Sequence, residues 1–185
     1  MPTRWTVRSI MRAMLPVLLV LTVVELGSGL VLGSFQQTLL QYPTLLALVP
    51  VTIGTAGNLG SILAARLSTA FHLGTLSFGR EDEVLAGNAV ATVALAITIF
   101  PVVGFGAWML TWFIDGTELG LGTVVLVSLT SGIVLAFVAV LVTLVATYVA
   151  YRFELDPDDV VIPVVTNACD VLGVIVLFAV VELLV

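Results

Sequence analysis

Five long apolar runs dominate this sequence and leave few folds open to it. They cover about residues 10–35, 43–66, 88–113, 121–151 and 160–185. A helix needs roughly 20 apolar residues to cross the hydrocarbon core of a bilayer, and each run is long enough. Only 10% of the residues are charged and 60% are hydrophobic, whereas soluble domains carry about 25% charged residues. The sequence therefore predicts an all-α membrane protein with five transmembrane helices in one domain over residues 1–185, in contact with membrane lipid.

The arginines predict how the chain is oriented. If the N-terminus is cytoplasmic, all six lie in cytoplasmic segments or at their border: Arg4, Arg8, Arg12, Arg66, Arg80 and Arg152. The segments expected outside, near residues 36–42 and 115–120, contain none. This satisfies the positive-inside rule. We expect a multi-pass protein of the cell membrane with a cytoplasmic N-terminus and an extracellular C-terminus.

The charge balance and the reactive side chains exclude several classes of function. The formal net charge is −6 and the chain has no lysine, which indicates an acid-rich surface, as in a salt-loving organism, and no nucleic-acid partner. The single cysteine, Cys169, allows no disulfide framework within the chain. The lone histidine, His72, is expected in an interfacial loop without catalytic neighbours, so we expect no enzyme.

The fifth run carries an ionisable residue about two turns inside the membrane, Asp170. A carboxylate at this depth costs at least about 2.5–3.5 kcal/mol, so it normally faces a protein interior or a water-filled path. At 3.6 residues per turn it shares one polar stripe with four other residues, namely Pro163, Thr166, Asn167 and Gly173. The alternative is a protonated Asp170 that donates a hydrogen bond to a neighbouring helix.

The second run contains Pro50, Gly54, Gly57, Asn58 and Gly60 in its middle. These residues weaken a helix and expose backbone carbonyls, which lipid does not satisfy unless they line a cavity or a protein contact. One interpretation is a broken helix that forms part of an ion path. The other is that the glycines only allow close helix packing.

The depths of the two polar stretches bring them to a similar level. At 1.5 Å per residue, Asn58 lies about 22 Å from the outer end of its span and Asp170 about 15 Å from the inner end. In a slab about 30 Å thick these positions overlap within a turn or two. We expect both stretches to face the same pore.

Oxygen ligands dominate this predicted site. Asp170, Asn58, Asn167, Thr166 and carbonyls near Gly57 offer carboxylate, amide and carbonyl oxygens, which suit Mg²⁺. Softer metals would require thiolate or imidazole ligands, but Cys169 lies off the Asp170 stripe.

The first run also holds a carboxylate, Glu25, about midway along its length. It is either a second ion or proton site or a partner for a polar residue on a neighbouring helix.

The combined pattern resembles the transmembrane domain of the MgtE magnesium channels and of the related eukaryotic solute carriers for magnesium. The residues that carry the resemblance are the sequence Gly54-Thr55-Ala56-Gly57-Asn58, with Pro50 before it and Arg66 after it, and Asp156-Pro157 followed by Pro163 and residues 166–173. The family's pore aspartate falls on Asp170, its Gly-Asn motif on Gly57 and Asn58, and a carbonyl that faces the ion on Thr166.

This resemblance implies a homodimer whose pore is lined by the second and fifth helices of both subunits, with Mg²⁺ as the transported ion. Barely a dozen residues precede the first span, so we expect neither a nucleotide-sensing nor a gating domain before it. The eukaryotic carriers hold two such units in one chain, and dimerisation is therefore expected to complete the pore.

Three mechanisms stay open at this stage. The first is channel-like conduction of divalent cations down the membrane potential, and the second is an exporter coupled to Na⁺ or H⁺ with Glu25 as the coupling carboxylate. The third is a non-conducting membrane subunit whose polar stripes form a protein interface.

Overall fold

Six α-helices and their short connections make up the part of the chain that the computed structural model describes, residues 6–76, 82–114 and 117–185. The helices are α1 (Val7–Ser34), α2 (Gln36–Gln41), α3 (Thr44–His72), α4 (Glu83–Ile114), α5 (Leu121–Arg152) and α6 (Pro157–Leu184). All except α2 are long and apolar enough to cross a membrane. The five predicted spans are therefore confirmed.

The helix ends follow from local capping. The Thr6 hydroxyl accepts a hydrogen bond of 3.2 Å from the Ser9 backbone N–H at the start of α1, which satisfies one of the free donors of the first turn. At the start of α6, Asp156 accepts from the Asp158 N–H at 3.1 Å. Pro157 follows at the first helical position, where its missing N–H costs nothing.

Two local predictions differ from the structure. No helix was predicted where α2 lies, a six-residue helix that turns the chain between the first two spans. His72 was expected in a loop, but it is the last residue of α3, because the amphipathic helix continues through Arg66 to the cap at Leu73.

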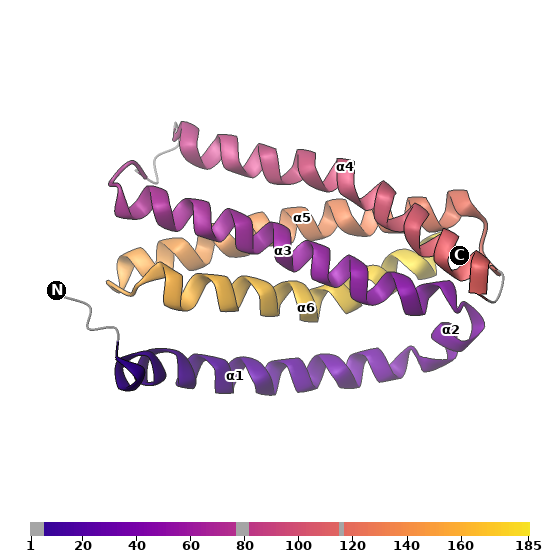
Figure 1. The fold of residues 1–185 in the computed structure, drawn as a ribbon, viewed down its shortest axis with the longest axis horizontal. Coiled ribbons are helices and arrows are strands. Elements are labelled where there is room, and N and C mark those ends of the chain that lie inside the picture. The colour runs from indigo at the N-terminus through magenta and orange to yellow at the C-terminus, as the bar shows by residue number, and fades with distance from the viewer. Residues whose placement is uncertain (1–5, 77–81, 115–116) are drawn as a thin grey trace.

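Four helices, α3 to α6, pack against one another as a bundle, and α1 lies outside it (Figure 1). Successive long helices run antiparallel, so α1, α4 and α6 point one way and α3 and α5 the other. Apart from its covalent neighbour α2, the only described helix that α1 contacts is α6. No residue of α1 is buried. The helix α6 is thus flanked by α1, α3 and α5.

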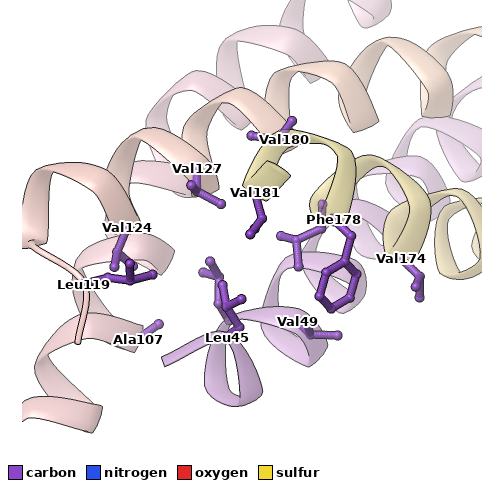
Figure 2. Packing of buried hydrophobic residues seen from close by; sticks show 12 residues of the cluster. Leu45, Val49, Ala107, Leu119, Val124, Val127, Val174, Phe178, Val180 and Val181 are labelled. Atoms are coloured by element: carbon purple, nitrogen blue, oxygen red, sulfur yellow. The ribbon is translucent and has the colours of Figure 1, made fainter. Parts of the chain in front are cut away.

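The bundle has two apolar clusters, one toward each end. Figure 2 shows the cluster near the C-terminus, where Phe178 and Val181 of α6 meet Leu45 of α3 and Val124 of α5. The second cluster surrounds Phe100, which is fully buried. Its ring lies so close to Gly132 that a Cβ built on that glycine would be 2.0 Å from the ring. A glycine is therefore required on α5 at this contact.

Candidate functional site

Close contact between α3 and α6 forms one wall of the candidate site. A Cβ built on Gly57 would lie 4.0 Å from the Thr166 backbone, and one built on Gly60 would lie 2.4 Å from the Val165 side chain. Further along, Gly173 of α6 faces Ile53 of α3 in the same way. The two polar stretches that were expected at a similar depth are therefore neighbours in the bundle.

The opposite side of α6 is joined to α1 by a polar contact. The Asn167 side chain is 4% exposed, and its amide nitrogen donates to the Glu25 carboxylate at 2.8 Å and to the Leu21 carbonyl at 3.1 Å. The two expectations for Glu25 are thus partly resolved, because it pairs with a polar residue on a neighbouring helix. Both hydrogen bonds use the amide nitrogen of Asn167 and not its side-chain oxygen.

Asp170 lies between these two contacts on the surface of α6. Thr166 and Gly173 face α3 and Asn167 faces α1, so the spacing of 100° per residue turns Asp170 toward the gap between α1 and α3. Its side chain is half-buried. No described residue makes a hydrogen bond to it, and Glu25 is bonded to Asn167, three residues earlier on α6.

Two alternatives from the sequence bear on this arrangement. A protonated Asp170 bonded to a neighbouring helix finds no acceptor among the described residues of the chain. The broken helix, one of the two interpretations of the second span, is not observed, since α3 is continuous from Thr44 to His72. The Gly57 carbonyl accepts a hydrogen bond of 2.9 Å from the Ser61 hydroxyl, and Gly60 packs closely against Val165.

Asn58 makes no hydrogen bond to Asp170 in the described part of the chain. Its side chain is exposed on the outer face of α3, as is Gly54 one turn earlier. The large apolar side chains of Val51 and Ile62 are also exposed on this helix.

Thr166 and Glu25 line one pocket of about 270 Å³ between α1 and α6, whose other walls are Leu18, Leu21, Thr22, Ile162 and Pro163. The Thr166 hydroxyl donates back to the carbonyls of Ile162 and Pro163, at 3.1 and 3.0 Å. The structure therefore gathers Glu25, Thr166, Asn167 and Asp170 on one side of α6. The Glu25–Asn167 pair was not predicted from the sequence, although the two polar residues, each at mid-depth of a different span, indicated a contact between those spans.

A carboxylate at this position can bind a cation only with other oxygen donors or water. Glu25 on α1 and Asp170 on α6 supply two carboxylates, and the pocket beside Thr166 holds room for water molecules, which occupy about 30 Å³ each. This donor set contains no thiolate, because Cys169 is buried against Gly60 on the other side of α6. Oxygen donors of this kind suit hard divalent cations.

Comparison with known proteins gives one family and two relatives. The family model for MgtE, described as a divalent cation transporter, matches residues 49–180. Solute carrier family 41 member 3 of Mus musculus is 26% identical over 156 residues, which are 81% of this chain and 32% of that protein. The same carrier of Rattus norvegicus is also 26% identical over 156 residues, with 34% of its length covered.

The extent of these matches limits what they describe. The chain spans about a third of the length of the curated relatives it matches. The family match begins in α3 and ends in α6, so it includes Gly57, Asn58, Thr166, Asn167 and Asp170. It does not include α1, and Glu25 therefore rests on the geometry alone.

Proposed function

We propose, from the premise that this chain belongs to the MgtE family of divalent cation transporters, that it carries a divalent cation, Mg²⁺, across the cell membrane. The observation that carries the proposal is the half-buried Asp170 of α6, which has no hydrogen bond from any described residue. An intramembrane carboxylate of this kind marks an ion path more often than a structural contact. The matched family is one of transporters, in agreement with the expectation of a non-enzymatic role.

The proposed pore forms between two copies of the chain. Gly54 and Asn58 lie on an exposed face of α3, and Asp170 is half-buried on the neighbouring helix α6. A two-fold axis along this face brings both copies of α3 and α6 together, and two Asp170 carboxylates then give one site with a formal charge near −2. Asn58, Thr166 and backbone carbonyls near Gly57 complete an oxygen-only lining for a hydrated ion.

The proposed orientation has the N-terminus in the cytoplasm and the C-terminus outside. Arg8, Arg66 and Arg152 are exposed and lie toward the same end of the bundle as the start of α1 (Figure 1). Arg4 and Arg80, which belong to the same argument, lie outside the described residues. With this orientation the membrane potential drives cations inward through a channel.

A second mechanism is favoured by the position of Glu25. It is hydrogen-bonded to Asn167, three residues before Asp170 on α6, and lines the same pocket as Thr166. In a Na⁺- or H⁺-coupled exporter, this carboxylate would bind the coupling ion next to the Mg²⁺ site. Flux that does not respond to Na⁺ or pH gradients would exclude it.

The test is Mg²⁺ flux into proteoliposomes under an imposed membrane potential. We expect flux from the parent, a loss of at least tenfold in Asp170→Asn, and partial loss in Asn58→Ala. Glu182→Gln, which removes an exposed carboxylate near the end of α6, is the matched control and should carry flux as the parent does. Equal flux from Asp170→Asn and the parent would contradict the proposal.

Water accessibility separates a pore from a dry protein interface. A cysteine in place of Asn58, in a Cys169→Ser background, should react with an aqueous thiol reagent in the assembled dimer. Protection of this cysteine, together with absent flux, would instead identify a non-conducting subunit whose polar face binds another protein.

A further inference from the structure

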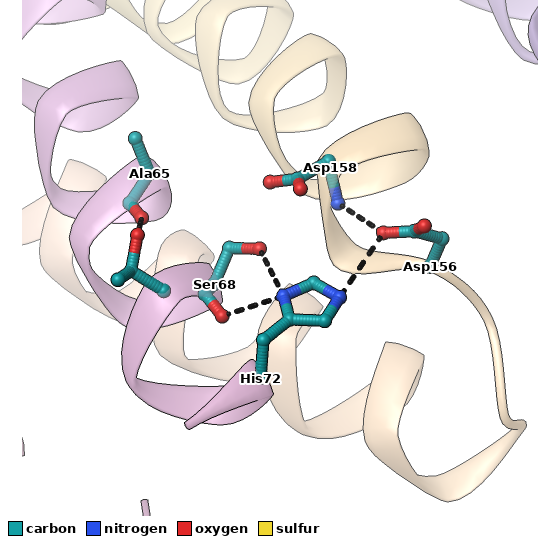
Figure 3. A network of polar contacts seen from close by, with 6 residues as sticks. Ala65, Ser68, His72, Asp156 and Asp158 are labelled. Carbon is teal, nitrogen blue, oxygen red and sulfur yellow. Dashed lines mark hydrogen bonds and ion pairs between the residues drawn. The ribbon is translucent and has the colours of Figure 1, made fainter. Parts of the chain in front are cut away.

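Three potential metal ligands converge where α3 ends and α6 begins. His72 comes from the last turn of α3, and Asp156 and Asp158 come from the cap and first turn of α6. One ligand atom from each lies within 4.8 Å of the other two. Figure 3 shows the imidazole between Ser68 of its own helix and the Asp156 carboxylate. Asp158 and Asp170 are twelve residues apart on α6, so the cluster is about 18 Å from the proposed pore site.

The hydrogen bonds of His72 fix which ring nitrogen is free. Nδ1 lies 2.9 Å from the Ser68 carbonyl oxygen, and a carbonyl can only accept, so Nδ1 carries the hydrogen. In the neutral ring the lone pair is then on Nε2, which faces Asp156 Oδ1 at 3.9 Å. Metal-binding histidines commonly donate their other N–H to a backbone carbonyl in this way, which orients the ring toward the ion.

We propose that His72, Asp156 and Asp158 bind a first-row transition metal ion such as Zn²⁺ or Co²⁺, at a site separate from the transport path. Imidazole together with carboxylates is a ligand set that suits these ions, whereas Mg²⁺ takes oxygen ligands alone. Three protein ligands leave at least one coordination position for water. A pocket of about 410 Å³ lies against His72 and Asp156 and connects the site to solvent.

The three ligand atoms lie slightly farther apart than ligand atoms around a bound metal ion. Metal–ligand bonds of about 2.0–2.1 Å place tetrahedral ligand atoms about 3.4 Å apart, compared with separations of up to 4.8 Å here. The side chains of His72 and Asp156 are 50% and 44% exposed, so they can rotate inward by the ångström required. The metal ion would lie between His72 Nε2 and Asp156 Oδ1, which are 3.9 Å apart; a contact of this length at an exposed position contributes little by itself.

A bound ion would join two helices that the chain holds together elsewhere by packing. The ligands belong to the ends of α3 and α6, which contact one another at Gly57 and Thr166. Binding therefore ties these helix ends by a coordination bridge and limits their separation. This inference does not depend on the transported ion or on the direction of transport.

The experiment is a Co²⁺ titration of the full chain in detergent, followed by the visible absorption of the bound ion, with Zn²⁺ as competitor. The parent and Asp170→Asn should each bind one Co²⁺ per chain with equal affinity. His72→Ala and Asp158→Asn should lose at least tenfold in affinity. Asp159→Asn, which removes a neighbouring carboxylate outside the cluster, is the control and should stay within twofold of the parent.

Several results would overturn the proposal. One is a parent protein that binds no Co²⁺, and another is a His72→Ala protein of unchanged melting temperature that binds it as tightly as the parent. Loss of binding in Asp170→Asn alone would assign the ion to the proposed pore site at Asp170. Because the Asp170→Asn protein is expected to bind Co²⁺ while it carries no Mg²⁺ flux, failure of this site and failure of the transport proposal are distinguishable.

Discussion

Asn167 is the residue that connects the outer helix to the bundle. Its amide nitrogen reaches both the Leu21 carbonyl and the Glu25 carboxylate of α1, and its side chain is nearly fully buried. Removing the partners of a buried amide costs more free energy than the amide's hydrogen bonds contribute on average, because the unpaired group stays away from water. The attachment of α1 thus depends on one polar side chain and on apolar contacts such as the stacked rings of Phe35 and Phe178, whose centroids are 4.0 Å apart.

We predict an energetic coupling between Asn167 and Glu25. In a double-mutant cycle with Asn167→Ala and Glu25→Ala, the interaction should stabilise the folded protein by about 0.6 kcal/mol and by at most about 1.7 kcal/mol, as for hydrogen bonds in other membrane proteins. Denaturant unfolding in mixed micelles measures the four free energies. Asn58→Ala, at an exposed position, should leave the free energy of unfolding nearly unchanged.

A coupling of zero in that cycle would contradict the pairing. Glu25→Gln offers a second check, since glutamine keeps the oxygen that accepts from Asn167. It should retain most of the stability of the parent, while it removes the charge that acts on Asp170.

At the scale of the helix, glycines decide how closely α3 approaches α6. Gly60 faces Val165, whose side chain is fully buried and has one preferred rotamer in a helix because it is β-branched. A side chain at position 60 cannot be accommodated by rotating this valine. The glycines at Gly57, Gly60 and Gly173 therefore set the distance between the two helices that carry the candidate site.

We predict that Gly60→Val destabilises the protein by about 1–3 kcal/mol, the usual cost of an overpacked core, and that it lowers Mg²⁺ flux through displacement of α3. Gly106→Val is the matched control, because a Cβ at Gly106 meets no atom within 4 Å. It should stay within about 0.5 kcal/mol of the parent. Thermal melts and flux assays on both variants test this, and equal melting temperatures would show that α3 and α6 can separate without cost.

The long helices could be predicted because each apolar run is bounded by charged or polar residues. The polar face with Asp170 could be predicted because helical spacing is regular. The sequence could not decide whether Pro50 and the glycines break the second span. That outcome depends on partners such as Val165, more than 100 residues away in sequence, since tertiary contacts outweigh helix propensity. The position of Asn167 against α1, and that of His72 beside Asp156, depend on long-range packing in the same way.

At the scale of the whole molecule, the two ends of the helix bundle carry different side chains. Exposed Arg8, Arg66 and Arg152 lie toward the end where α1 and α6 begin and α3 ends. Stacked Trp108 and Trp112, with ring centroids 6.2 Å apart, lie toward the other end, in the last part of α4. Aromatic rings of this kind are common at a membrane–water interface.

We predict that in the cell the end of the bundle with the arginines lies on the cytoplasmic side and the end with the tryptophans lies on the outer side. In a Cys169→Ser background, Thr117→Cys should react with a membrane-impermeant thiol reagent added to intact cells, because it precedes α5 on the outer side. Thr75→Cys, just after α3, should react only after lysis. The reverse pattern would place the N-terminus outside and would reverse the direction in which the membrane potential drives cations.

The isolation of α1 also has a consequence for biosynthesis. This helix leaves the ribosome before the other four described spans, and its polar partner Asn167 follows Glu25 by 142 residues. At about 5–20 residues per second, the first span waits roughly 7–28 s in the bilayer with its carboxylate unpaired by the chain. Docking of α1 is therefore a late event of assembly that waits for α6, and a nascent chain cut short before α6 would leave Glu25 without Asn167 as its partner.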